Sequence, residues 1–200
     1  MKLLKSQELC TSSIIENIIH LNTGLSTFWS NSLGWAPESA ANLMNKSRLD
    51  WQVSLSKCLN LWTSEESRKL GDGVLILAWT NLGSLIEGSL KLFLAVFYDD
   101  YKKDLEAVTD RNDNIIDPDT LGLEKLRQFF NRKNTMLWSK EWNDFVLKIQ
   151  GYRNSIHAFK NRKIGTFDEF EDSVKIYLEL LMTINSRLPY PDEMHEPPWY

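Results

Sequence analysis

Residues 73–98 read GVLILAWTNLGSLIEGSLKLFLAVFY, and apolar side chains recur in them at every third or fourth position. This interval matches the 3.6-residue repeat of an α-helix and predicts a helix over residues 74–103. Because further apolar residues lie beside this repeat, the helix should be central and packed on several sides. The repeat consists of Leu75, Trp79, Leu82, Ile86, Leu90, Phe93, Phe97 and Tyr101.

The same segment is apolar enough to be tested as a membrane span. Glu87 and Lys91 lie near its middle, and each would cost roughly 2.5–3.5 kcal/mol at the centre of a bilayer. Asn81 adds a further polar group. We therefore expect a buried helix of a soluble protein and no association with a membrane.

The rest of the chain also has helical spacing, and no run of alternating apolar and polar residues predicts a strand. A length of 200 residues suits one domain. The predicted fold class is an all-α helical bundle with about four core helices plus an N-terminal helical extension. Residues 1–188 are expected to form this domain, and the proline-rich, acidic residues 189–200 a flexible tail. The other predicted helices cover about residues 6–21, 37–62, 120–132, 140–161 and 167–188, the last one starting at a capping box formed by Thr166 and Glu169.

The cysteine and histidine content bears on the compartment and on metal binding. Cys10 and Cys58 lie far apart and form no CxxC motif, so neither a disulfide framework nor a zinc site is expected. The initial residues MKLLKSQELCTSS lack the apolar core of a secretory signal. These features favour the cytoplasm. The three histidines, His20, His157 and His195, are dispersed, so we expect no metal site and no cofactor.

The net charge of −4 is unevenly distributed along the chain. From Thr120 to Lys163, ten basic residues stand against three acidic ones, which gives this segment a net charge of +7 and the remainder −11. A basic segment in an acidic protein indicates either a local anion-binding face or a solvated surface that complements an acidic one elsewhere.

Residues 151–165 read GYRNSIHAFKNRKIG and lie at the end of the predicted helix over 140–161. Arg153 is placed at the border of the apolar face, where a guanidinium is costly unless it meets an anion or hydrogen-bond acceptors. His157 follows four residues later, so it should share the helix face of Arg153 and can titrate near neutral pH. An arginine and a histidine without metal ligands suit phosphoryl chemistry on RNA, because histidine can move protons and arginine can stabilise phosphate charge.

The Arg153–His157 pair also has a purely structural interpretation. An arginine and a histidine at this spacing are common on the border of a helix face. Arg153 can then simply form an ion pair with an acidic residue such as Glu87, with no role in chemistry.

The string YRNSIHAF resembles the signature of the HEPN superfamily (higher eukaryotes and prokaryotes nucleotide-binding domains), in which an Arg-Asn dipeptide is followed shortly by His. Its members are helical bundles with the motif on a late helix and a further long helix after it. The central segment LIEGSLKLFL is similar to the E-x-x-L-K pattern of many such domains. The resemblance covers about residues 74–188 and makes residues 1–73 the N-terminal extension. The interval between Arg153 and His157 is three residues here, whereas the family pattern generally has four to six.

The resemblance implies a metal-independent ribonuclease, or a binding relative that has lost catalysis, acting as a homodimer whose two motifs line one cleft. By position, Arg153 would stabilise phosphate charge, His157 would be the general acid and base, and Asn154 would orient the motif or bind substrate. Glu87 would position Arg153 or His157. The RNA backbone would be guided by three basic residues, Lys160, Arg162 and Lys163.

Three functional hypotheses follow. The first is a cytoplasmic, HEPN-like, metal-independent endoribonuclease, a toxin or anti-phage defence effector restrained by a cognate inhibitor or a defence-system protein. The alternative is a non-catalytic helical module that binds RNA, a nucleotide or a protein partner. The third is an interaction protein whose interface uses the abundant tryptophans, among them Trp29, Trp35, Trp51 and Trp62.

Overall fold

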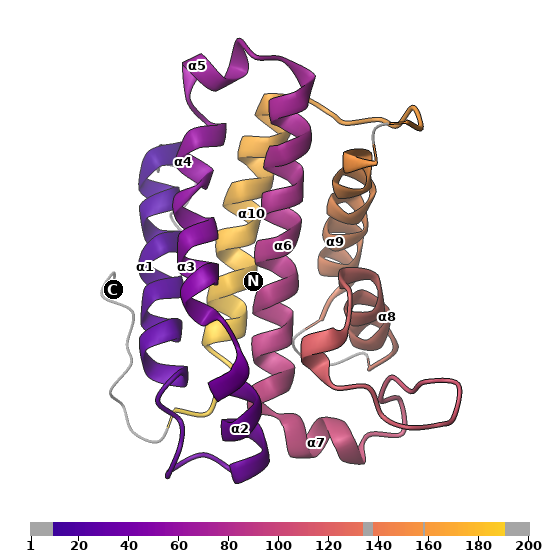
Figure 1. The fold of residues 1–200 in the computed structure, drawn as a ribbon. Helices are drawn as coiled ribbons and strands as arrows, with labels where there is room; N and C mark the ends of the chain where they lie inside the picture. The colour runs from indigo at the N-terminus through magenta and orange to yellow at the C-terminus, as the bar shows by residue number, and fades with distance from the viewer. Residues whose placement is uncertain (1–9, 134–137, 158, 191–200) are drawn as a thin grey trace.

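The protein is an all-α helical bundle, as predicted (Figure 1). The computed structural model describes residues 10–133, 138–157 and 159–190, and within these ranges the only extended pairing is one isolated β-bridge between Thr109 and Ile115. The described helices are α1 (Thr11–Trp29), α2 (Glu38–Lys46), α3 (Leu49–Lys57), α4 (Leu59–Trp62), α5 (Glu65–Arg68), α6 (Asp72–Val96), α7 (Tyr98–Lys103), α8 (Leu123–Lys133), α9 (Lys140–Arg153) and α10 (Phe167–Asn185), with the 3-10 turns η2 (Pro118–Thr120) and η3 (Asn154–Ile156).

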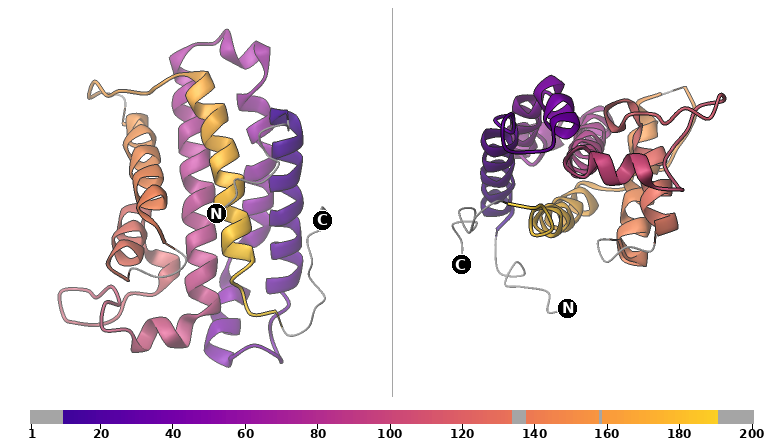
Figure 2. Two further views of the ribbon diagram at one scale, coloured as in Figure 1. Left: turned by 180° about the vertical axis from the view of Figure 1, so that it is seen from behind. Right: turned by 90° about the horizontal axis from the view of Figure 1, so that it is seen from below.

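Helix α6 lies at the centre of the bundle. It contacts α3, α4 and α10 on one side and α8 and α9 on the other (Figures 1 and 2). Among the described helices, α6 is long and apolar enough to cross a membrane by length and composition, but 56% of its most apolar window is buried within the bundle. The predicted central helix is therefore found, with fully buried Trp79, Leu82, Leu85, Ile86 and Leu90.

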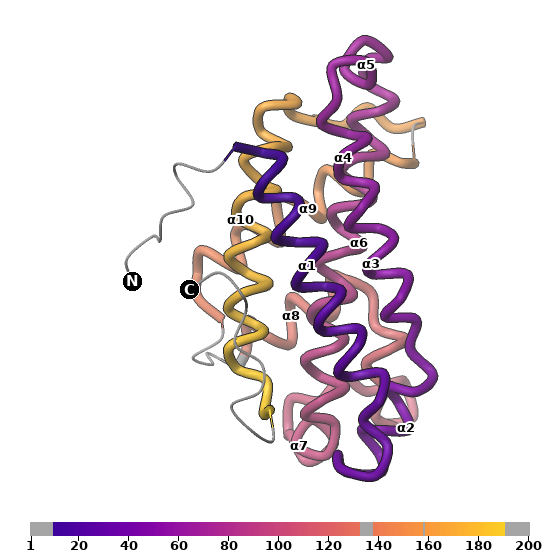
Figure 3. Tube along the Cα trace, turned by 90° about the vertical axis from the view of Figure 1, so that its left-hand side faces the viewer, coloured from indigo at the N-terminus to yellow at the C-terminus, as the bar shows by residue number. Residues whose placement is uncertain are grey.

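Helices α1, α3, α6 and α10 form a closed four-helix arrangement. Helix α1 contacts α3 and α10, and α6 contacts the same two helices from the other side (Figure 3). Ile14, Ile15 and Ile18 of α1 are completely buried in the same hydrophobic cluster as Leu181 of α10. The helices expected as an N-terminal extension thus contribute directly to the main core.

Helices α8 and α9 cover the remaining side of α6. Helix α9 begins at a Ser139 cap, whose hydroxyl accepts a hydrogen bond from the Trp142 N–H. The face that α9 turns toward the core is the apolar stripe of its sequence, because side chains three or four residues apart lie on one side of a helix. Its buried residues are Trp142, Phe145, Val146, Ile149 and Tyr152.

Within the described residues, several helix boundaries differ from the sequence prediction. The first helix does not end at residue 21 but continues to Trp29, because burial of Leu25 and Trp29 outweighs the cost of about 1 kcal/mol for Gly24 in a helix. The predicted helix over 37–62 is interrupted after Lys46, where Ser47 has an extended backbone. The central helix ends at Val96, and the separate helix α7 completes the predicted span.

The last helix starts where the sequence predicts. The Thr166 hydroxyl accepts a hydrogen bond from the Glu169 N–H, and the Glu169 carboxylate accepts one from the Thr166 N–H. Gly165 precedes this cap with φ +69°, a conformation that is strained for residues with a side chain. Gly165 therefore shapes the entry to α10 and does not belong to α9, which ends at Arg153.

The beginning of the predicted tail packs on the bundle. The ring of Tyr190 lies 5.0 Å from that of Phe28 and 5.6 Å from that of Trp29, measured between centroids. Residues 191–200 lie outside the described residues. The predicted flexibility of that part therefore stays a prediction.

We expect Thr166→Ala to lower the free energy of unfolding by about 1 kcal/mol, because it removes the cap of α10. Urea denaturation followed by circular dichroism measures this change. Thr23→Ala is the matched control, since the exposed Thr23 hydroxyl only donates to the Ile19 carbonyl of its own helix. Equal losses in the two variants would contradict a stabilising cap.

Candidate functional site

The backbone after α9 places Arg153 and His157 differently from the sequence prediction. Helix α9 ends at Arg153 instead of residue 161, and η3 follows. His157 has φ −82° and ψ 53°, outside the helical region. Since the chain leaves α-helical geometry between them, the predicted sharing of one helix face is wrong.

The residues after η3 turn back toward α6. The indole Nε1 of Trp79 in α6 donates to the Ile164 carbonyl at 2.7 Å, so the chain cannot continue along the axis of α9. As a result Ile156 is 42% exposed and Phe159 is fully exposed. In a helix that continued to residue 161, as the sequence predicts, both side chains would lie on the apolar face with Ile149 and Tyr152.

Arg153 lies flat against the central helix. Its Nη1 donates to Glu87 Oε2 at 2.6 Å, and the two side chains are 27% and 17% exposed. Gly83 leaves room for the aliphatic part of Arg153, because a Cβ at Gly83 would lie 2.7 Å from Arg153 Cδ. A missing side chain on α6 is thus what allows the guanidinium to reach Glu87.

The Glu87 carboxylate accepts from two further donors. Lys91 Nζ donates to Oε1 at 2.9 Å, and the backbone N–H of Leu123 at the start of α8 donates to Oε2 at 3.0 Å. Burial of the carboxyl opposes its ionisation, but the hydrogen bonds and charges of Arg153 and Lys91 outweigh this effect and hold the pKa of Glu87 below its ordinary value. Glu87 is therefore an ionised centre that joins α6, α8 and α9.

The other motif residues differ in burial. Asn154 is half-buried, and its side-chain oxygen accepts from Gln150 Nε2 at 3.4 Å. The His157 side chain is exposed, and the hydrogen bonds described for this residue involve its backbone, with the N–H donating to Asn154 and the carbonyl accepting from Lys160. The motif thus combines an arginine that is fixed by an ion pair with Glu87 and a histidine whose imidazole is exposed.

Two of the three predicted RNA-contacting residues line an open groove, which we call the α9 groove. Arg162 and Lys163 form one side, and α9 forms the other. Lys160 is exposed but lies outside this set. The α9 residues that line the groove are Asp144, Leu147, Lys148, Gly151 and Tyr152.

The α9 groove and Arg153 lie on different faces of α9. At about 100° per residue, Arg153 is roughly half a turn from Asp144 and about 140° from Lys148. The predicted catalytic residues and the predicted basic residues therefore do not form one continuous pocket. They meet only at the C-terminal end of α9, where His157 lies.

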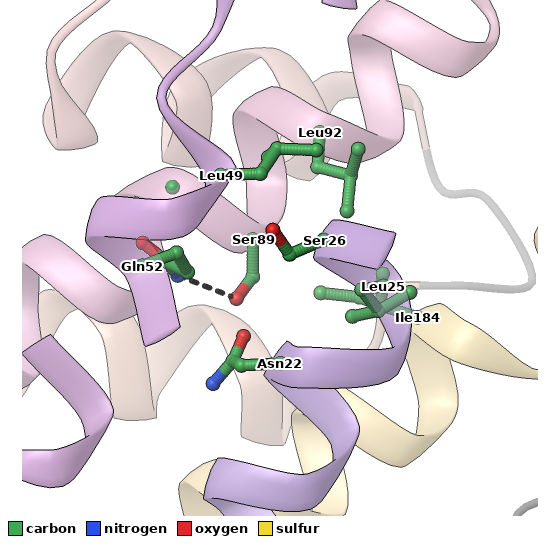
Figure 4. A pocket seen from close by; sticks show the side chains of 9 residues that line it. Asn22, Leu25, Ser26, Leu49, Gln52, Ser89, Leu92 and Ile184 are labelled. Atoms are coloured by element: carbon green, nitrogen blue, oxygen red, sulfur yellow. Dashed lines mark hydrogen bonds between the residues drawn. The ribbon is translucent and has the colours of Figure 1, made fainter. Parts of the chain in front are cut away.

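A second hollow, within the four-helix core, is too small for a substrate. It lies between α1, α3, α6 and α10 and is lined by Asn22, Gln52 and Ser89 among apolar side chains (Figure 4). Gln52 Nε2 donates to the Leu85 carbonyl at 2.6 Å and to Ser89 Oγ at 3.3 Å. Its volume of about 10 Å³ for the centre of a water molecule admits one water and no larger ligand.

Comparison with models of known protein families, with curated proteins and with solved structures gives no match. Within the described parts of the chain, His, Cys, Asp and Glu side chains form no group of three that could hold a metal ion.

Sequence reasoning missed Gly83 and Lys148. Gly83, Glu87 and Lys91 are spaced by four residues, which places them on one face of α6. This spacing could have indicated that Gly83 lies next to Glu87. The excess of basic residues between 120 and 163 includes Lys148, Arg162 and Lys163, but only the turn of the chain after Ile156 brings these three to one groove.

We expect Glu87→Gln to lower the free energy of unfolding at pH 7 by roughly 1–3 kcal/mol, because it leaves the half-buried Arg153 and Lys91 without their counter-charge. A carboxyl whose pKa is lowered by folding stabilises the native state above its unfolded pKa, ordinarily about 4.3, and this contribution is lost as the pH falls through the folded pKa. The difference between variant and wild type should therefore shrink below about pH 4.

Chemical denaturation at several pH values between about 7 and 2 tests this expectation. The control is Asp172→Asn, which removes an exposed partner of Lys175 and should cost at most about 0.5 kcal/mol. A Glu87→Gln deficit that stays constant down to the lowest pH would contradict the assigned ion pair.

We expect Gly83→Ala to displace Arg153 from Glu87 while leaving global stability close to wild type. The new Cβ would occupy the place of the Arg153 stem, whereas alanine is favoured over glycine in a helix by about 1 kcal/mol. An NMR titration should then show the pKa of Glu87 rising toward its ordinary value. Gly73→Ala is the control, because a Cβ at Gly73 meets no atom within 4 Å, and an unchanged pKa in Gly83→Ala would contradict the close contact.

Proposed function

We propose that this protein is a HEPN-like, metal-independent endoribonuclease of the cytoplasm, acting as a toxin or anti-phage defence effector. The observation that carries the proposal is the ion pair between Arg153 and Glu87 beside the exposed His157. The ion pair fixes a cation at the end of α9, and the turn that follows leaves an imidazole accessible to a large substrate.

Each side chain has a defined task in the proposed reaction. A guanidinium has five N–H donors, and since Glu87 binds Arg153 at Nη1, other donors can contact a phosphate oxygen. His157 takes the proton of a ribose 2′-OH, the 2′-oxygen attacks phosphorus, and the 5′-oxygen leaves with a proton. The products are a 2′,3′-cyclic phosphate and a free 5′-OH. Asn154, half-buried beside Arg153, orients the motif or binds substrate.

A homodimer would supply the second proton-transfer group. One histidine cannot be both base and acid at the same moment, but two copies of His157 facing one cleft can divide these tasks. The exposed Ile156 and Phe159 beside the motif support this arrangement, because a second copy would bury them. A cognate inhibitor or defence-system protein could restrain activity by covering the same surface.

The decisive experiment is cleavage of RNA by the purified protein in EDTA, with analysis of the 3′ ends. We expect 2′,3′-cyclic phosphate ends, and we expect His157→Ala to lower the cleavage rate by about 10²–10⁴-fold. His20→Ala, at an exposed residue of α1, is the matched control. If His157→Ala cleaves as fast as wild type, the assignment is wrong.

Expression should also arrest cell growth, and His157→Ala should relieve the arrest.

The second candidate is a non-catalytic module that binds RNA, a nucleotide or a protein partner. One observation favours this candidate. Because α9 ends at Arg153, His157 does not lie on the same helix face as the guanidinium. This function requires that Arg153→Ala weakens salt-dependent RNA binding and that no concentration of wild-type protein cleaves RNA.

A further inference from the structure

The α9 groove concentrates positive charge from two separate segments. Lys148 comes from the middle of α9, and Arg162 and Lys163 come from the chain just before α10. Asp144 is the acidic residue in the groove, and its carboxylate is bound by Lys140. The groove therefore has three cations for one carboxylate that is already neutralised.

The wall formed by residues 162–165 is anchored in place. Trp79 binds the Ile164 carbonyl, and its ring lies 4.7 Å from that of Tyr152 between centroids. A Cβ at Gly165 would come within 3.2 Å of the Tyr152 ring, so the chain passes as close to Tyr152 as a residue without a side chain allows. These contacts set Arg162 and Lys163 opposite Lys148 before any ligand arrives.

The floor of the groove is apolar and open. Leu147 is 49% exposed, and a Cβ at Gly151 would meet no atom within 4 Å. The Lys148 ammonium lies 5.9 Å from the ring centroid of Tyr152, which lines the groove, and 5.9 Å from that of the fully buried Trp79. Cations along the rim of a groove are the component of a single-strand site that follows the phosphate backbone.

We infer that the α9 groove binds the phosphate backbone of single-stranded RNA at a distance from the bond that is cut. This inference rests on the proposed function for the identity of the ligand. Because Arg153 lies on another face of α9, a strand that occupies both places must cross the end of α9, where His157 is exposed. The groove then holds the flanking part of the substrate and leads it to the motif.

Gly151 allows a test that leaves the helix intact. Gly151→Glu places a carboxylate over the open floor, and Gly151→Gln places a neutral side chain of nearly the same size there. A Cβ at Gly151 would meet no atom within 4 Å, so both side chains start in open space, and both residues favour a helix more than glycine does. The comparison therefore isolates charge in the groove from volume and stability.

The experiment measures binding of a short single-stranded RNA to each variant in a His157→Ala background, at several salt concentrations. We expect Gly151→Glu to bind about tenfold more weakly than Gly151→Gln at low salt. Lys148→Ala should reduce the slope of log K against log salt by about 0.7, the value for one phosphate contact on a single strand. Lys46→Ala, at an exposed residue of α2, should leave the slope unchanged.

Equal RNA affinity of Gly151→Glu and Gly151→Gln would overturn the inference. It would also be overturned if polyglutamate displaced RNA as well as polyuridine does at equal charge, since the groove would then be a site for acidic protein segments. The proposed function fails separately. If the protein with intact His157 and the His157→Ala variant cleave equally, the catalytic assignment falls while a charge effect at Gly151 still supports the groove.

Discussion

The carboxylate of Glu87 is the constraint on which the arrangement of the candidate site depends. It accepts hydrogen bonds from the end of α9, from Lys91 of its own helix and from the first N–H of α8. An ionised carboxylate in a mostly buried place is stable only when such donors replace water. The position of α9 relative to α6 and α8 follows from this requirement.

Two glycines adapt the central helix to its polar neighbours. At Gly83 the absence of a side chain admits the stem of Arg153, and at Gly88 it admits the amide of Gln52. Each glycine costs a helix about 1 kcal/mol relative to alanine. Hydrogen bonds from Arg153 to Glu87 and from Gln52 to the Leu85 carbonyl offset that cost. The same helix therefore forms an apolar core and receives polar groups from two directions.

The ion pair at Glu87 serves both the catalytic and the structural interpretation of the motif. A guanidinium fixed by a carboxylate is pre-organised for a phosphate, and it equally secures one helix to another. The exposed His157 separates the two interpretations, because an imidazole whose described contacts are made by its backbone adds little to stability. The α9 groove adds a second, separate region of positive charge, so that under the proposed function substrate binding and chemistry would occupy different faces of one helix.

The periodicity of the sequence determined the all-α class, the central helix, the apolar face of α9 and the capping box of α10, because each depends on residues close together in the chain. The sequence also offered Glu87 as one possible acidic partner of Arg153, because an arginine at the border of an apolar face needs an anion or hydrogen-bond acceptors. Only the tertiary structure decided where α9 ends and which face each functional residue occupies. The bond from Trp79 to the Ile164 carbonyl turns the chain back, and that contact joins residues 85 positions apart, beyond the reach of local periodicity.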